Sequence, residues 1–176
     1  MLIDMTRISA TDLAYAAGVI DSDGCITVSL VGEKRCNGSY AITACVAMKS
    51  DDIPQWFTAT FGGRVRIIGG KGKWTEHRGG ERVYFPPTPR WEMYAQDAAD
   101  FLESILPYLK LKRLRAEAAI KLARMHRKRG RSRKPGYARE VSPEEKEQRK
   151  ELAHFIRAEN HKGNDRVVMT AKWGIN

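Results

Sequence analysis

Apolar side chains in the N-terminal part of the chain change from helical to alternating spacing. Ser9 and Asp12 form a capping pattern that predicts the start of a helix just before Leu13. Behind this helix, apolar and polar side chains alternate over residues 25–31 and again over residues 40–49. Alternation of this kind is typical of half-buried strands, so the two stretches predict a β-hairpin.

The same order of elements then repeats. Aromatic side chains at helical spacing, followed by a pair of glycines, predict a short helix over residues 51–61 with these rings in the core. Strands are predicted over 64–68 and 90–95, on either side of a Gly-rich, charged loop over 69–89 in which residues 83–85 extend the pairing. The order αββαββα predicts an α+β fold, with a twisted antiparallel four-stranded sheet and helices on one of its faces.

A C-terminal extension follows this repeat. Ser142 at the N-cap, Pro143 at the first helical position and acids in the first turn predict a helix to about residue 160. Its narrow apolar stripe consists of Leu152, Phe155 and Ile156. Such a stripe needs a partner, either on the same chain or on a second copy. We therefore divide the chain into a core over 1–126, a basic linker over 127–141 and a helix with its tail over 142–176.

Length and composition suit one domain with a real core, because the chain has 176 residues, of which 42% are hydrophobic. No apolar run approaches the roughly 20 residues that span a bilayer, and the N-terminus lacks a signal-peptide pattern. We therefore expect a cytoplasmic protein, associated with the nucleoid if the host is a prokaryote. Cys25, Cys36 and Cys45 are odd in number and include no C-x-x-C pair, so we expect reduced thiols.

The net charge of +10 is concentrated in the C-terminal third. Residues 110–162 hold 18 Lys and Arg against 7 Asp and Glu, whereas the rest of the chain holds 13 against 14. Eight cations follow one another without an acid: Lys121, Arg124, Arg127, Lys128, Arg129, Arg131, Arg133 and Lys134. A solvated or disordered tail is the ordinary explanation of such a run. The alternative, which we favour, is a surface that follows the phosphates of a nucleic acid.

The first helix ends in two carboxylates, Asp21 and Asp23. A helix C-terminus carries roughly half a negative charge, so an acid there costs about 0.3–1 kcal/mol. A bound divalent cation would reverse that penalty. An ordinary helix-to-strand turn explains residues 21–24 as well, whereas an EF-hand loop does not fit, because Gly32 would occupy its twelfth position.

The same helix carries small side chains three and four residues apart, at Ala14, Ala17 and Gly18. Side chains this small allow two helix backbones to approach closely. We therefore expect these residues to form an interface with a second copy of the helix.

Residues 17–24, Ala-Gly-Val-Ile-Asp-Ser-Asp-Gly, resemble the signature of the LAGLIDADG homing endonucleases. A second stretch, Leu-Pro-Tyr-Leu-Lys-Leu-Lys over residues 106–112, resembles a segment that in this family ends in a lysine near the active site. The resemblance covers about residues 9–125 and contains one motif per chain. It implies a symmetric homodimer with half an active site in each chain, a roughly palindromic DNA target and a place in a mobile intron or intein.

The resemblance also implies the chemistry, which is metal-dependent hydrolysis of both strands of DNA by an endonuclease. Asp23, with the backbone carbonyl of Ser22, would hold Mg²⁺ or another divalent cation, and Lys112 would stabilise the transition state. Asp21 is expected to brace the turn. For Lys112, the alternative is an ordinary cation on a solvated helix.

DNA contacts are expected on the polar face of the sheet and along the basic segment. The candidates on the sheet are Thr27, Ser29, Thr43, Arg64, Arg66 and Arg90, of which the arginines suit guanine in the major groove. The candidates in the basic segment are Arg127, Lys128, Arg129, Arg131, Arg133 and Lys134. A plain solvated sheet face is the alternative.

One departure from the family pattern concerns Met48, which stands where many single-motif members have a polar side chain that orders active-site water. Two other functions stay open, and Met48 and the basic segment favour the first of them. One is a DNA-binding regulator or intron-RNA maturase that keeps the fold without cleaving. The other is a basic protein of the ribosome or nucleoid that binds nucleic acids without sequence preference.

Overall fold

The structure is a computed structural model that describes residues 7–31, 39–70, 72–76, 82–127 and 141–160. Its elements are α1 (Ala10–Ser22), β1 (Gly24–Val31), β2 (Ser39–Ala47), α2 (Asp52–Phe61), β3 (Arg64–Ile68), β4 (Lys73–Glu76), β5 (Arg82–Phe85), β6 (Thr88–Tyr94), α3 (Ala95–Ile105), the 3-10 turn η2 (Leu106–Tyr108), α4 (Arg113–Arg127) and α5 (Pro143–Asn160).

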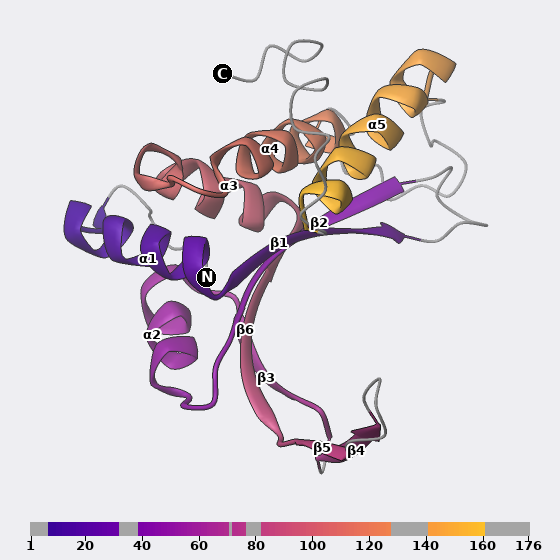
Figure 1. Ribbon diagram of the computed structural model, residues 1–176. Coiled ribbons are helices and arrows are strands. Elements are labelled where there is room, and N and C mark those ends of the chain that lie inside the picture. The colour runs from indigo at the N-terminus through magenta and orange to yellow at the C-terminus, as the bar shows by residue number, and fades with distance from the viewer. Residues whose placement is uncertain (1–6, 32–38, 71, 77–81, 128–140, 161–176) are drawn as a thin grey trace, which may run out of the picture.

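Four antiparallel strands form the main sheet in the order β1-β2-β6-β3, which confirms the predicted α+β fold and its sheet. The sheet is strongly curved, with α1 to α4 on its convex side and the concave face left open (Figure 1). Two strand boundaries differ from the prediction by two residues. β2 ends at Ala47, and β6 already begins at Thr88.

A second, two-stranded sheet lies within the predicted loop over 69–89, at the far end of the curved sheet (Figure 1). The pairing predicted for residues 83–85 is present, but their partner is β4, so the hairpin is separate from the main sheet. The rings of Trp74 and Tyr84 lie 5.3 Å apart and are exposed. Sequence alternation missed β4 because four residues are too few for a clear pattern.

Aromatic rings join α2, α3 and β6 into one core. Phe57 and Phe101 are fully buried and lie 4.7 and 5.1 Å, respectively, from Trp91, measured between ring centroids. The Trp91 indole nitrogen donates a hydrogen bond of 2.7 Å to the carbonyl of Gly62. The prediction that the aromatic residues of α2 lie in the core is therefore confirmed. The largest side chain of this core, Trp91, also has a hydrogen-bond partner for its one polar atom.

The apolar stripe of α5 packs on this same chain, since Leu152, Phe155 and Ile156 belong to the same hydrophobic core. Buried Arg149 donates to the carbonyl of Met125 near the end of α4. At the other end of α5, the Asn160 amide donates to the carbonyl of Ile26 on β1. Of the two partners considered for the stripe, these contacts support the same chain.

Among the described residues, no helix has the length and apolar character needed to cross a membrane.

Gly24 stands where α1 turns directly into β1. A Cβ at this position would lie 2.6 Å from the Cα of Ile20 and 2.9 Å from its carbonyl oxygen. Because both atoms belong to the backbone of fully buried Ile20, they cannot move aside cheaply. The close approach explains why the chain has glycine between the two elements.

We therefore expect Gly24→Ala to lower the free energy of unfolding by about 1–3 kcal/mol, the usual cost of overpacking. Urea denaturation followed by circular dichroism measures this change. Ser29→Ala, an exposed position on the same strand, serves as the control and should stay within about 0.5 kcal/mol of the wild type. Equal stability of the two variants would contradict this account of Gly24.

Candidate active site

The end of α1 is bound to the segment that leads into α4. The Asp21 carboxylate accepts hydrogen bonds from the backbone N–H groups of Lys110 (2.6 Å), Leu111 (3.1 Å) and Lys112 (2.9 Å). Three donors satisfy its charge without any cation. The expectation that Asp21 braces the turn is confirmed, and it joins residues about 90 positions apart in the sequence.

Lys112 completes the same contact from the other side. Its ammonium donates to the carbonyls of Ile20 (2.7 Å) and Gly24 (2.8 Å), with that of Ser22 at 3.4 Å. It therefore pairs with carbonyls that the end of α1 leaves free, those of Ile20 and Ser22, and with the first carbonyl of β1. Burial lowers the pKa of Lys112, as does the nearby Arg115 guanidinium, against the opposing effect of Asp21.

Asp23 is the C-cap residue of α1 and is exposed. Its carboxylate accepts a hydrogen bond of 3.2 Å from the hydroxyl of Ser22, which also approaches the carbonyl of Val19. Lys112 and Asp23 thus meet at one end of α1, where the sequence motifs placed them. The exposed carboxylate faces solvent, while its neighbour Asp21 is fully engaged.

The groups at this end of α1 suit a hard divalent cation, which takes oxygen ligands. An Asp23 carboxylate and a Ser22 carbonyl supply two such oxygens from one chain. Mg²⁺ commonly uses one or two carboxylates, with water and phosphate oxygens completing its shell. Within the described residues, no group of three or more His, Cys, Asp or Glu side chains could enclose a metal ion.

The outer surface of α1 differs in part from the predicted interface. Ala14 and Gly18 are exposed, and a Cβ added at Gly18 would meet nothing within 4 Å in this chain. Ala17, in contrast, is fully buried in the core and cannot contact a second copy. The face that is available also carries Tyr15, which is 48% exposed and packs edge-on against Trp56 at 5.0 Å. Spacing alone could not show which side of the small-residue stripe the core covers.

The concave face of the sheet carries polar side chains in rows across the strands. Strand register places Cys25, Cys45, Glu92 and Arg64 opposite one another in a single row. A neighbouring row contains Ala47, Arg90 and Arg66. Side chains directly opposite in antiparallel strands share a face, so the three predicted arginines lie together on the open side of the sheet.

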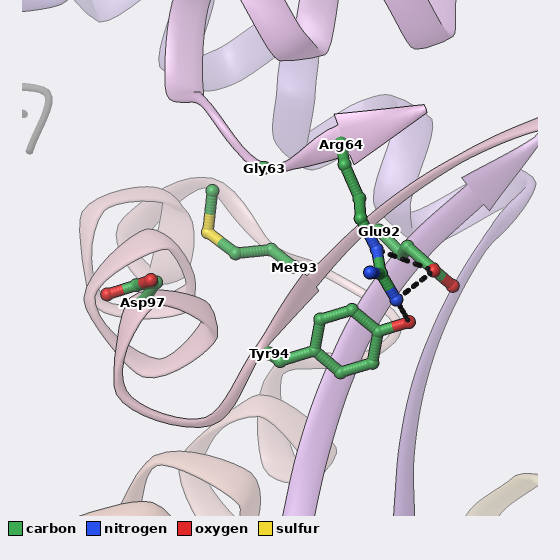
Figure 2. A pocket seen from close by; sticks show the side chains of 6 residues that line it. All are labelled: Gly63, Arg64, Glu92, Met93, Tyr94 and Asp97. Carbon is green, nitrogen blue, oxygen red and sulfur yellow. Dashed lines mark hydrogen bonds and ion pairs between the residues drawn. The ribbon is translucent and has the colours of Figure 1, made fainter. Parts of the chain in front are cut away.

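Glu92 binds all three arginines, a role that the sequence did not indicate. Its Oε1 atom accepts from Arg66 Nε at 2.7 Å and from Arg64 Nε at 3.2 Å, while Oε2 lies 3.5 Å from Arg90 Nε. Arg64 also donates to the hydroxyl of Tyr94 at 3.1 Å (Figure 2). Together with Gly63, Met93 and Asp97, the side chains of Arg64, Glu92 and Tyr94 line an open pocket of about 310 Å³.

The other predicted DNA contacts divide into three groups. Ser29 is exposed and Thr27 is half-buried on the concave face. Thr43 corrects the prediction, because only 6% of its surface is exposed and little of it can reach a base. Arg127 ends α4, but its side chain lies outside the described residues. The remaining cations of the basic segment also lie outside them: Lys128, Arg129, Arg131, Arg133 and Lys134.

Met48 follows the end of β2 and packs, partly buried, against the hydrophobic core. Its backbone N–H donates to the carbonyl of Pro89 at 3.1 Å. An apolar side chain in this place offers no hydrogen bond to a water molecule near the end of α1.

Two thiols lie opposite each other on adjacent strands. Cys25 is on β1, two residues beyond Asp23, and Cys45 is on β2. A hydrogen bond from Cys45, opposed by burial and assisted by Arg115 and Lys112, lowers the pKa of Cys25 to about 6. The same hydrogen bond and burial raise the pKa of Cys45. The opposite directions of the two pKa shifts favour the thiolate form at Cys25 over that at Cys45, beside the candidate active site.

No family model and no curated sequence matches the chain. Among solved structures, the homing endonuclease I-CvuI in complex with its target, in the presence of Ca, superposes with a TM-score of 0.60 at 19% identity, covering 92% of this chain and 89% of I-CvuI. I-CvuI with an I-CreI target in the presence of Mg superposes with a TM-score of 0.59 at 18% identity, covering 90% and 87%.

The archaeal intron-encoded homing endonuclease I-Vdi141I, complexed with DNA, superposes with a TM-score of 0.61 at 14% identity, covering 94% of each chain. At these identities the likeness concerns the fold, which is that of the LAGLIDADG homing endonucleases.

Asp21→Asn should lower the free energy of unfolding by about 2–3 kcal/mol, since it replaces a charged acceptor of three backbone amides by a neutral one. Urea denaturation provides the measurement. Asp23→Asn is the matched control, because the same change at an exposed carboxylate should leave stability within about 0.5 kcal/mol. If both variants were equally stable, Asp21 would not hold the two segments together.

The rate of Cys25 alkylation by iodoacetamide should rise with pH around a midpoint near 6, because only the thiolate reacts. Peptide mass mapping separates Cys25 from the other cysteines. Cys45→Ala removes the hydrogen-bond donor and should move the midpoint upward, whereas Cys45→Ser keeps a donor and should hold it low. A wild-type midpoint between 8 and 9, the ordinary range of a thiol, would refute this assignment.

Proposed function

We propose that this protein is a homodimeric, metal-dependent endonuclease that makes double-strand breaks at a long, roughly palindromic DNA site. The observation that carries the proposal is the end of α1, where Asp21 and Lys112 are engaged in holding the turn and Asp23 stays exposed. A carboxylate held in a rigid turn beside an ammonium suits chemistry on a phosphate.

DNA as the substrate is supported by the concave face of the sheet. Arg64 and Arg66 are 64% and 51% exposed on this face, and the helices lie on the other side (Figure 1). A B-DNA major groove admits a two-stranded β-ribbon. I-CvuI and I-Vdi141I, which have a similar fold, are in complex with their target and with DNA, respectively. We propose an intron-encoded origin for this protein too, like that of I-Vdi141I.

A second copy is expected to pack against the exposed side of α1. Ala14 and Gly18 leave room for a close helix-to-helix approach, and Gly18 has open space beyond its Cα. A two-fold axis between two such helices would bring the Asp23 carboxylates of both copies near each other. Two-fold symmetry of the protein would be matched by a roughly palindromic target.

The proposed reaction is hydrolysis of a phosphodiester, in which a water oxygen bonds to phosphorus and the bond from phosphorus to the 3′ oxygen breaks. A divalent cation bound by Asp23 and the Ser22 carbonyl would lower the pKa of the attacking water and stabilise the leaving oxygen. Lys112 stands beside Asp23 and adds positive charge where the phosphate becomes more negative. Asp21 keeps both side chains in position through the backbone of residues 110–112.

Met48 favours a second candidate function, a regulator or intron-RNA maturase that binds through the same fold without cleaving. Its apolar side chain packs on the core and supplies no polar group to the site. Selective binding without cleavage is the result that would favour this candidate.

We expect the wild-type protein, incubated with a randomised duplex library and Mg²⁺, to cut one near-palindromic sequence. Asp23→Asn should reduce cleavage at least about a hundredfold, because it removes a charged metal ligand while leaving the fold intact. Sequencing of the cut and bound fractions measures both activities together.

Asp51→Asn serves as the control for this variant. Asp51 is an exposed N-cap residue of α2 whose side chain makes no capping hydrogen bond, so cleavage should be unchanged. Cleavage that persists in Asp23→Asn would refute the assigned metal ligand. Binding with steep salt dependence and no preferred sequence would instead favour a non-specific nucleic-acid-binding protein.

A further inference from the structure

Glu92 is a buried carboxylate on the face that we propose contacts DNA. Its side chain has no exposed surface, although it lies on the concave side of the sheet among Arg64, Arg66 and Arg90. A buried acid is costly unless it is paired, and here two arginines share Oε1 while the third lies 3.5 Å from Oε2. Its placement at the centre of the arginines requires a physical explanation.

Arg66 and Arg90 approach Glu92 through Nε, whereas Arg64 uses both Nε and one Nη atom, the latter 3.1 Å from Oε1. Nε of Arg66, Arg64 and Arg90 lies 2.7, 3.2 and 3.5 Å, respectively, from a carboxylate oxygen. A guanidinium has five N–H donors in a rigid planar fork. For Arg66, contact at Nε leaves the far edge of the fork, formed by the two Nη atoms, directed away from the carboxylate.

The three arginines differ in what their Nη atoms contact. Arg64 uses one Nη atom on the hydroxyl of Tyr94, and its guanidinium lies 5.0 Å from the centre of that ring (Figure 2). Arg90 is only 25% exposed and places one Nη atom 3.1 Å from the sulfur of Cys45. Arg66 is 51% exposed, and its recorded contact within the described residues is the one at Nε. Arg66 therefore presents the most complete free edge on the concave face.

The charge of Glu92 is maintained by the cluster. Burial raises the pKa of Glu92, but the hydrogen bond with Tyr94 and the charges of Arg66, Arg64 and Arg90 outweigh it, so the net pKa is lowered. The carboxylate stays ionised at neutral pH and offsets the repulsion among three like charges. Without it, long and flexible arginine side chains would have no common direction.

We propose that Glu92 is a positioning residue that aims the Nη edge of Arg66 and, secondarily, the other Nη atom of Arg64 into the major groove, so that each half-site requires guanine where these donors meet the bases. The inference rests on the proposed DNA-binding function and adds the residue that sets its base preference. Guanine presents O6 and N7, two acceptors that match a guanidinium edge. Arg90 lies beneath the other two as a support.

The test measures the base preference of wild-type protein and Glu92→Gln at every target position, by binding to randomised duplexes without Mg²⁺. Glutamine keeps the shape but loses the charge that holds the Nε atoms. We expect guanine preference to fall about tenfold at one or two adjacent positions per half-site, consistent with the loss of a bidentate contact. Affinity for scrambled duplex should stay equal or rise, because one negative charge is removed.

Glu103→Gln is the charge-matched control. Glu103 pairs with Arg124 on the helical side of the molecule, so this variant changes the net charge equally but should keep the base profile. Arg66→Lys is a second variant that tests the inference even if Glu92→Gln does not fold. Arg66 is half exposed, so its replacement should leave the fold intact, and lysine lacks the planar fork of donors. It should lose guanine preference at one of the positions affected in Glu92→Gln, and the double variant should lose little more there.

An unchanged base profile in Glu92→Gln, with selective binding intact, would overturn the inference and leave the proposed function standing. An equal loss of preference at all positions would also overturn it, because that result marks a structural role. A wild-type protein that selects no duplex would instead overturn the proposed function, and the inference with it.

Discussion

The candidate site depends on one reciprocal contact between the end of α1 and the start of α4. A helix C-terminus leaves carbonyls unpaired, and the segment that enters a helix leaves N–H groups unpaired. Lys112 donates to the carbonyls of Ile20 and Gly24, and Asp21 accepts from three N–H groups of residues 110–112. Each segment thus satisfies the other, and both charges are compensated in the process.

This contact changes the meaning of the two acids at the end of α1. On the sequence alone, both carboxylates faced an unfavourable helix dipole, and a cation was the evident remedy. The structure meets the charge of Asp21 with backbone amides and the free carbonyls with the Lys112 ammonium. Asp23 alone remains exposed, so the two aspartates have different tasks despite their adjacent positions.

Local patterns predicted much of this molecule because they reflect local physics. The Ser9 cap, whose hydroxyl accepts from the N–H of Asp12, and the alternation over β1 and β2 needed no knowledge of distant residues. The two motifs at residues 17–24 and 106–112 were also visible. Their contact across about 90 residues was expected only through the family resemblance, since spacing cannot show which distant segments meet.

The errors arose where burial depends on long-range register. Ala17 and Thr43 were assigned to outer surfaces from periodicity, but the core and the neighbouring strands cover them. Glu92 was not among the predicted site residues, because its central role follows only from the pairing of β6 with β3, which sets Arg64 opposite it. Strand order is a property of the whole chain, and no short sequence window contains it.

The same register explains how a polar sheet face can be rigid. Arginines on an open surface lose much side-chain entropy when they are held for one geometry, about 2 kcal/mol each. Here a buried carboxylate, an aromatic ring and a cysteine sulfur hold Arg64 and Arg90 before any partner arrives. The ordering cost is met during folding, so a surface of this kind loses less entropy on binding and discriminates by shape as well as by charge.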